Sequence, residues 1–120
     1  NLGELPQEIG SLTQLSVLYL AGNKLAKIPE GVGRLTNLSE LNLSINNISE
    51  LPHQIGQLVN LTFLNLALNK LTSLPDSIVR LSRLKFLLLD ETILLSPLQK
   101  KWIEELKCNG CRVWLTAHLD

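Results

Sequence analysis

Apolar and polar residues follow one pattern along this chain, and the pattern repeats every 23 residues. The copy at residues 58–80 reads LVNLTFLNLALNKLTSLPDSIVR. The first full copy has leucine, asparagine, proline, isoleucine or valine at the matching positions: Leu12, Leu15, Leu18, Leu20, Asn23, Leu25, Ile28, Pro29 and Val32. Self-similarity at a fixed period of this length is typical of stacked repeat proteins. The sequence therefore predicts a solenoid in which each repeat forms one coil.

Each repeat opens with a short alternation of leucines and other residues, which predicts a β-strand with its leucines pointing inward. The predicted strands are Val17–Ala21, Glu40–Ser44, Phe63–Ala67 and Phe86–Asp90. Because they lie one period apart, we expect them to be parallel and in register. The Leu-Pro segment that follows predicts an irregular or 3-10 return, since proline restricts φ and disfavours a regular helix before it.

Asparagine occupies the same turn of three successive repeats, at Asn23, Asn46 and Asn69. An asparagine side chain can form hydrogen bonds with the exposed backbone groups of a turn. Stacked at one period, the three side chains are predicted to form a ladder that joins neighbouring coils. The series ends at Thr92, where the pattern expects asparagine.

We expect one domain with three parts: a partial repeat at residues 1–11, repeats at residues 12–95 and a C-terminal cap at residues 96–120. In the cap, Ser96 is a suitable N-cap and Pro97 suits the first helical position. Asn109-Gly110 is predicted to end this helix, and the alternation of residues 112–115 predicts a final strand that covers the open sheet edge. The apolar stripe of the helix consists of Leu98, Trp102, Ile103 and Leu106.

The first predicted strand has no strand before it, because residues 1–11 supply only the tail of a repeat. Natural sheets seldom leave an edge unprotected, and terminal repeats normally carry a polar cap. We therefore expect further repeats or another domain before Asn1, or a homo-oligomer formed through this edge.

Composition narrows the classes of partner. The chain has 11 basic and 11 acidic residues and no basic run, so we expect neither nucleic acid nor a membrane as a partner. Two cysteines are few for a small secreted domain, which favours a reducing, cytoplasmic location. A secreted or extracellular location stays open because four glycosylation triplets begin at Asn37, Asn42, Asn47 and Asn60.

Cys108 and Cys111 form a CxxC motif, which could be a redox pair or half of a zinc site. Cys108 falls at the C-terminal end of the predicted helix, where the dipole disfavours a thiolate. A zinc site needs about four ligands, and only His53 and His118 could complete one. We interpret both cysteines as structural, with a local disulfide as an open alternative. The sequence contains no catalytic triad or phosphate loop, so we expect no enzyme, no metal and no cofactor.

The predicted register assigns outward columns to the concave side of the sheet. The chain's one Tyr and two Phe all fall in these columns, although the repeat does not require them. Exposed aromatic side chains are typical of contact surfaces. We predict a protein-binding site formed by Val17, Tyr19, Glu40, Asn42, Phe63, Asn65, Phe86, Leu88, Asp90 and Glu91. Its acidic members would favour a partly basic partner. The alternative is that the rings pack on one another and only protect the sheet.

The segment Leu12–Leu94 resembles the leucine-rich repeat family, with the pattern LxxLxxLxLxxNxLxxLPxxIGx. Gly10, Gly33 and Gly56 occupy the glycine of that pattern, and Val79 departs from it. The LPxxIG return is similar to that of intracellular Ras-suppressor-like, plant Ras-group and bacterial leucine-rich repeat proteins.

The resemblance implies an α/β solenoid with a curved parallel sheet on its concave side and irregular or 3-10 returns on its convex side. It also implies a non-enzymatic scaffold that binds a protein on the concave face. A structural or spacer segment of a larger multidomain protein is the alternative.

Overall fold

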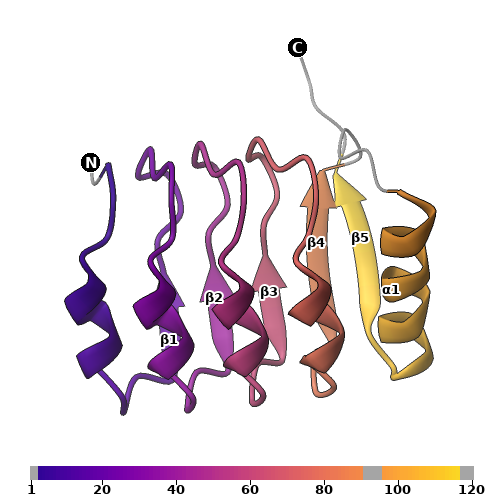
Figure 1. The fold of residues 1–120 in the computed structure, drawn as a ribbon, viewed down its shortest axis with the longest axis horizontal. Coiled ribbons are helices and arrows are strands. Elements are labelled where there is room, and N and C mark those ends of the chain that lie inside the picture. The colour runs from indigo at the N-terminus through magenta and orange to yellow at the C-terminus, as the bar shows by residue number, and fades with distance from the viewer. Residues whose placement is uncertain (1–2, 91–95, 117–120) are drawn as a thin grey trace.

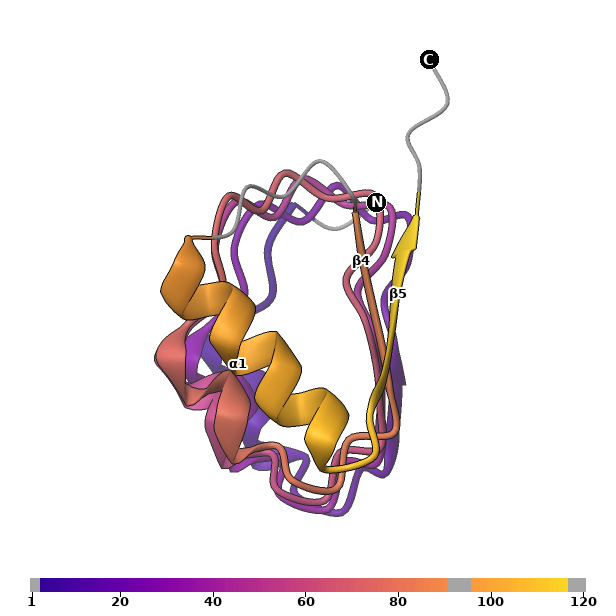
Figure 2. The same cartoon turned by 90° about the vertical axis from the view of Figure 1, so that its right-hand side faces the viewer.

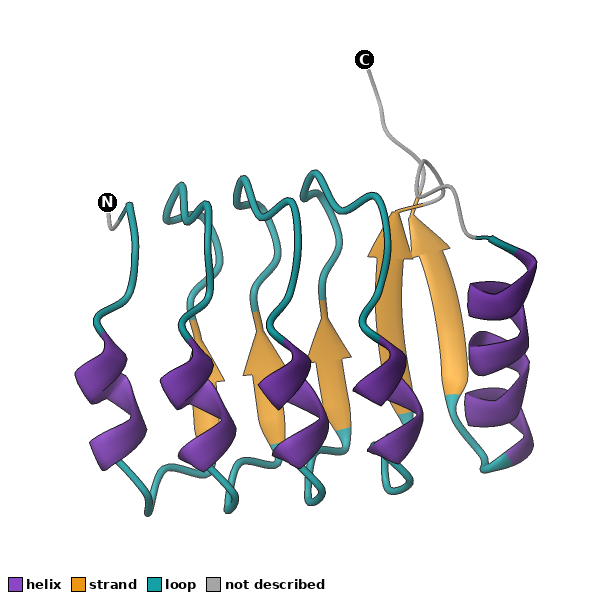
Figure 3. Cartoon of the chain, viewed as in Figure 1, coloured by secondary structure: helices purple, strands orange, loops and turns teal. Residues whose placement is uncertain are grey.

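The computed structural model of this protein describes residues 3–90 and 96–116. In this part of the chain, five parallel strands lie side by side in the order β1-β2-β3-β4-β5 (Figure 1). The strands are β1 (Val17–Tyr19), β2 (Glu40–Asn42), β3 (Phe63–Asn65), β4 (Phe86–Asp90) and β5 (Arg112–Thr116). The opposite wall consists of the 3-10 helices η1 (Gln7–Ser11), η2 (Glu30–Arg34), η3 (His53–Gln57) and η4 (Asp76–Arg80), and of the helix α1 (Pro97–Cys108) (Figure 3).

The strand register confirms the period in the sequence. Leu18 pairs with Leu41, and Leu41 pairs with Leu64, one period further each time. The strands β1 to β3 are two residues shorter than predicted, because the chain turns at residues in the left-handed region. These are Gly22, Ile45 and Leu68, with φ of 75°, 56° and 58°. The strand β4 keeps its predicted length because β5 pairs with it as far as Asp90.

Inward side chains fill the interior in rows that are spaced by one repeat. Four consecutive rows come from the loop before each strand, from the strand itself and from the residue that follows it in β2 and β3: Leu35, Leu58 and Leu81; Leu38, Leu61 and Leu84; Leu41, Leu64 and Leu87; Leu43, Leu66 and Leu89. All twelve are at most 1% exposed. Since burying one leucine side chain contributes about 1.5–3 kcal/mol, these rows supply the main driving force for stacking the coils.

Asn46 connects its own turn to the preceding coil. Its Oδ1 accepts hydrogen bonds from the backbone N–H groups of Asn23 and Leu25, at 2.9 Å each. Its Nδ2 donates to three backbone carbonyl groups, those of Leu20, Leu43 and Ser44. Asn69 repeats this arrangement one coil later, which confirms the predicted ladder.

The ladder ends on a carboxylate rather than an amide. Asp90 accepts hydrogen bonds from the backbone N–H groups of Leu68, at 2.7 Å, and Asn69, at 3.0 Å. The position where the sequence pattern breaks, Thr92, lies outside the described residues.

Glycine in the returns allows successive 3-10 helices to approach closely. A Cβ atom at Gly56 would lie 2.5 Å from Cβ of Ser77 in the next return, closer than two carbon atoms can pack. Val79 departs from the glycine pattern because its 3-10 helix, η4, packs against α1 instead of a further 3-10 helix. Val79 therefore marks the last 3-10 helix of the stack.

The helix α1 crosses the C-terminal end of the coils and begins as predicted (Figure 2). Ser96 Oγ accepts a hydrogen bond from the Gln99 N–H group at 3.2 Å, and Asn109 is the C-cap. Ile103 and Leu106 are buried, but Leu98 is 57% exposed, so its place in the predicted apolar stripe was wrong. The first turn of α1 docks instead through Gln99, whose Oε1 accepts from the Leu74 N–H group at 2.9 Å.

We expect Asn46→Ala to lower the free energy of unfolding by at least about 2 kcal/mol, because it leaves several buried backbone groups without partners. Urea unfolding followed by circular dichroism measures this loss. The control is Asn47→Ala, at the exposed neighbouring residue, which should change stability by less than about 0.5 kcal/mol. Equal effects of the two substitutions would refute the role of the ladder.

We expect Ile45→Asn to raise the free energy of unfolding by about 1 kcal/mol, since a left-handed φ is costly for a β-branched side chain and asparagine tolerates it better. Ile45 is 57% exposed, so little burial is lost. Asn47→Gly, in the same turn but without a positive φ, should instead destabilise the protein. Thermal unfolding of both variants provides the comparison, and a lower melting temperature for Ile45→Asn would contradict the expectation.

Candidate protein-interaction surface

The outward sheet face consists of the side chains that point away from the core on β1 to β5. It has two columns: Val17, Glu40, Phe63, Phe86 and Arg112; and Tyr19, Asn42, Asn65, Leu88 and Trp114. Figure 2 shows the sheet edge-on, with the 3-10 helices and α1 on its other side. No helix of the described residues covers the outward sheet face.

The face is rich in exposed apolar surface. Tyr19 is 59% exposed, Trp114 55% and Phe86 39%. Phe63 is half-buried and lies directly beside Phe86 in the register, at the spacing of adjacent strands. Lateral packing therefore shields one ring of this pair in part, while the other rings remain available for contact.

The polar groups of the face are partly engaged within the chain. The Tyr19 hydroxyl donates to Glu40 Oε1 at 2.5 Å, and this hydrogen bond is the main cause that raises the pKa of Tyr19. Asn42 Oδ1 accepts from the Ser44 N–H and hydroxyl groups, and Asn65 Oδ1 accepts from the Ala67 N–H group. The side-chain carbonyl oxygen of each asparagine is therefore engaged in a hydrogen bond with the residue two positions further along the chain.

The third predicted column does not belong to this face. Asp90 is 7% exposed, because its carboxylate binds the backbone of the preceding turn, so its prediction as an outward residue was wrong. Ser44 and Ala67, in the same column, are also buried. Glu91 lies outside the described residues. Of the acidic residues predicted to favour a basic partner, Asp90 is therefore not available on this face, whereas Glu40 is.

The outward sheet face gains two residues that the sequence analysis did not assign to it, Arg112 and Trp114. They come from β5, which pairs with β4 at an offset of 26 residues instead of 23. The helix α1 lies between these strands, so the period could not place them. The alternation of residues 112–115 was the available signal, but it gives no register with β4.

The two cysteines of the CxxC motif lie in different environments. Cys108 is exposed, Cys111 is buried and neither forms a disulfide. Burial raises the pKa of Cys111 to about 11, so the thiol stays protonated at neutral pH and is a poor nucleophile. His53 Nδ1 lies 3.1 Å from Asp76 Oδ1 on the exposed returns, and His118 lies outside the described residues.

Residues 3–90 and 96–116 contain neither a candidate metal site nor a candidate membrane-spanning helix. No three or more His, Cys, Asp or Glu side chains of this part gather closely enough to hold a metal ion. No helix of this part has both the length and the apolar character needed to cross a membrane.

Known proteins share both the sequence pattern and the architecture of this chain. A family model described as leucine rich repeat matches residues 13–71 and 36–94. A leucine-rich repeat protein of Leptospira interrogans has a similar structure, with a TM-score of 0.81 and 40% sequence identity over 91% of this chain. The leucine-rich repeat ectodomain of the Arabidopsis receptor kinase HAESA, solved in complex with an N-terminally extended IDA peptide hormone, has a TM-score of 0.78 and 34% identity over 98% of this chain.

The chain spans 27% of the Leptospira protein and 20% of the HAESA ectodomain. A search of the curated proteins finds no match. The family model covers more than half of the chain, and its repeats coincide with the coils described above. The chain therefore belongs to the leucine-rich repeat family.

Proposed function

We propose that this chain is a non-enzymatic interaction module that binds a protein segment on its outward sheet face. The observation that carries the proposal is the exposure of Tyr19, Phe86 and Trp114 together on one uncovered side of the sheet. Large exposed apolar patches usually mark interaction sites, and aromatic side chains are frequent anchors of such sites. Leucine-rich repeat domains are generally protein-interaction modules, and the similar HAESA ectodomain was solved with a peptide ligand.

The dimensions of the face favour a narrow ligand. Five strands at a spacing of about 4.8 Å span roughly 24 Å, and three consecutive strand residues, of which two face outward, span roughly 10 Å at about 3.3 Å each. A standard interface needs about 800 Å² per partner, several times the product of these lengths. An extended segment of about seven residues matches the long dimension, so we expect a peptide-like ligand.

A second candidate function, self-association or a spacer role within a longer solenoid, rests on the N-terminal end of the stack. Leu12 is 51% exposed, and Leu15, Leu18 and Leu20 are only half-buried. One repeat later, the matching leucines are at most 1% exposed: Leu35, Leu38, Leu41 and Leu43. The end of the core therefore presents apolar surface that another coil or a second copy of the chain would bury.

The first proposal is tested by selecting binders from a displayed library of random peptides and measuring their Kd by fluorescence anisotropy. Phe86→Ala with Trp114→Ala should raise Kd at least about tenfold, because truncating a central aromatic anchor removes more than about 1.4 kcal/mol. The control, Val59→Ala with Leu98→Ala, removes exposed apolar groups outside the face and should leave Kd within about twofold. Failure to select any peptide, or equal losses in both variants, would reject the proposal.

The second proposal is tested by sedimentation equilibrium over a wide range of concentrations. We expect the average mass of the wild type to rise with concentration, and Leu12→Glu to remain monomeric because a carboxylate in this interface is costly to desolvate. Leu98→Glu, at the opposite end of the stack, is the control and should behave like the wild type. A wild type that stays monomeric throughout would rule out self-association.

A further inference from the structure

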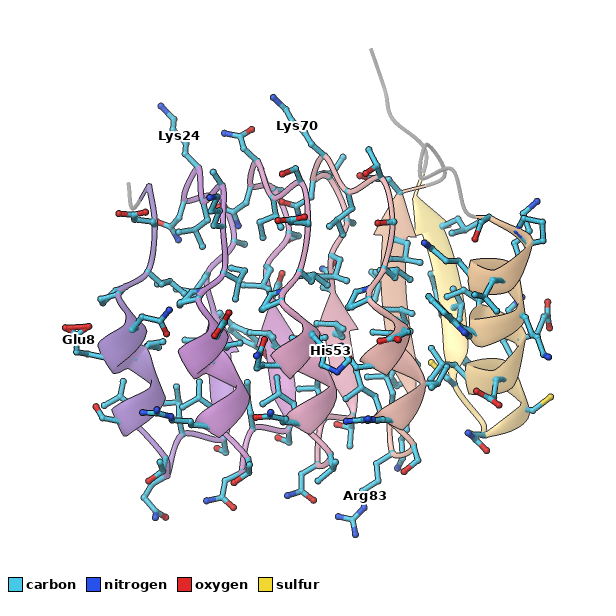
Figure 4. All side chains as sticks on the ribbon, viewed as in Figure 1. Glu8, Lys24, His53, Lys70 and Arg83 are labelled. Atoms are coloured by element: carbon cyan, nitrogen blue, oxygen red, sulfur yellow. The ribbon has the colours of Figure 1, made fainter. Side chains whose placement is uncertain are left out.

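A cavity of about 660 Å³ opens at the lower edge of the outward sheet face, where β4 and β5 begin. Three basic residues, Arg83, Lys85 and Arg112, contribute to its wall, together with Phe86 and the turn at Asn109 and Gly110. We call this cavity the basic pocket. Arg83 is labelled in Figure 4, where it extends from the lower edge of the coils.

The fold brings the three cations together from segments that are distant in sequence. After α1, Gly110 adopts a φ of 94°, which reverses the chain and starts β5. The Arg112 N–H group then donates to the Lys85 carbonyl at 2.8 Å, so Lys85, which directly precedes β4, lies beside the first residue of β5. Arg83 Nη1 donates to Asn60 Oδ1 at 2.7 Å, which positions the guanidinium at the edge of the pocket.

The described residues that line the pocket include three cations and no carboxylate. The ion pairs His53–Asp76 and Lys107–Glu104 include none of the three cations. All three side chains are exposed. In a chain with a net charge of zero, this cluster creates a local positive potential that attracts anions.

A carboxylate of a protein segment suits this pocket better than the phosphate backbone of a nucleic acid. A guanidinium presents five donors in a planar fork that matches a carboxylate, and Arg83 uses one of them on Asn60. Nucleic acid would need a stripe of cations that follows successive phosphates. The other polar residues of the outward columns are instead Tyr19, Glu40, Asn42 and Asn65, none of which is a cation.

Phe86 belongs both to the wall of the basic pocket and to the outward sheet face. We propose that the basic pocket receives an aspartate or glutamate side chain of the protein segment that binds this face. The proposal rests on the proposed function above and adds the chemistry of the ligand. The ligand has an apolar side chain on Phe86 and an acidic side chain beside it, at the end of the face formed by β4 and β5.

The test repeats the peptide selection on three proteins: the wild type, Lys85→Glu with Arg112→Glu, and Lys24→Glu with Lys70→Glu. The last is a matched control, because it makes the same change in net charge at exposed lysines on the opposite edge of the coils (Figure 4). Peptides selected by the wild type and by the control should be enriched in Asp and Glu. Peptides selected by the variant with a reversed pocket should lose this enrichment.

One wild-type peptide and its copy with Asn and Gln in place of Asp and Glu then provide the Kd values. The copy should bind the wild type about tenfold more weakly, whereas for Lys85→Gln with Arg112→Gln the two peptides should differ by less than about twofold. This neutral variant also serves if charge reversal prevents folding. No acidic enrichment in the wild-type selection, equal Kd values for both peptides on the wild type, or competition by a single-stranded oligonucleotide as effective as by the acidic peptide would overturn the proposal.

The same peptides separate this proposal from the proposed function. If binding is independent of the acidic residues but still fails in Phe86→Ala with Trp114→Ala, the basic pocket has no role and the outward sheet face remains the site. If the loss of both aromatic side chains leaves binding unchanged, both proposals fail.

Discussion

The structure depends on hydrogen bonds between the side chains of one turn and the backbone of the preceding turn. Asn46 accepts from two N–H groups of the coil before it, and its amide nitrogen donates to carbonyl groups of both coils. Because a turn in a buried position cannot leave its backbone groups unpaired, this contact sets the distance and the register between coils. The leucine rows can then interlock, and the register decides which side chains face outward.

The two ends of the stack differ in how the backbone groups and the core of the terminal coil are covered. At the C-terminal end, Asp90 accepts from the last complete turn, α1 covers the core and β5 extends the sheet by one strand. The strand β5 also supplies Arg112 and Trp114, which add a positive charge and an exposed aromatic ring to the outward sheet face. At the N-terminal end, Leu12 and the leucines after it remain partly exposed. The polarity of the solenoid therefore places the charged part of the proposed site at one end and an apolar stacking surface at the other.

The period of the sequence was sufficient to predict the coils, the parallel register and the two outward columns, because every repeat places the same side chain in the same environment. Prediction failed where the environment changes. Asp90 looked like an outward residue by its position, but its carboxylate accepts hydrogen bonds from the backbone N–H groups of Leu68 and Asn69 and is buried. Arg112 and Trp114 were not assigned to the face because α1 interrupts the period, and the pairing of β5 with β4 is a tertiary contact. The left-handed φ of Ile45 and Leu68 was equally hidden, since neither residue type favours it.

The central claim is that the register of the coils creates one binding face, and it is tested most directly by nuclear magnetic resonance. A ¹⁵N-labelled sample of the chain is titrated with a peptide selected from the displayed library, and the shifts of the assigned amide signals are mapped on the structure. We predict that the largest shifts fall in β1 to β5, strongest around Phe86, Arg112 and Trp114, while η1 to η4 stay unchanged. Shifts concentrated in η1 to η4, on the opposite wall, would contradict the account.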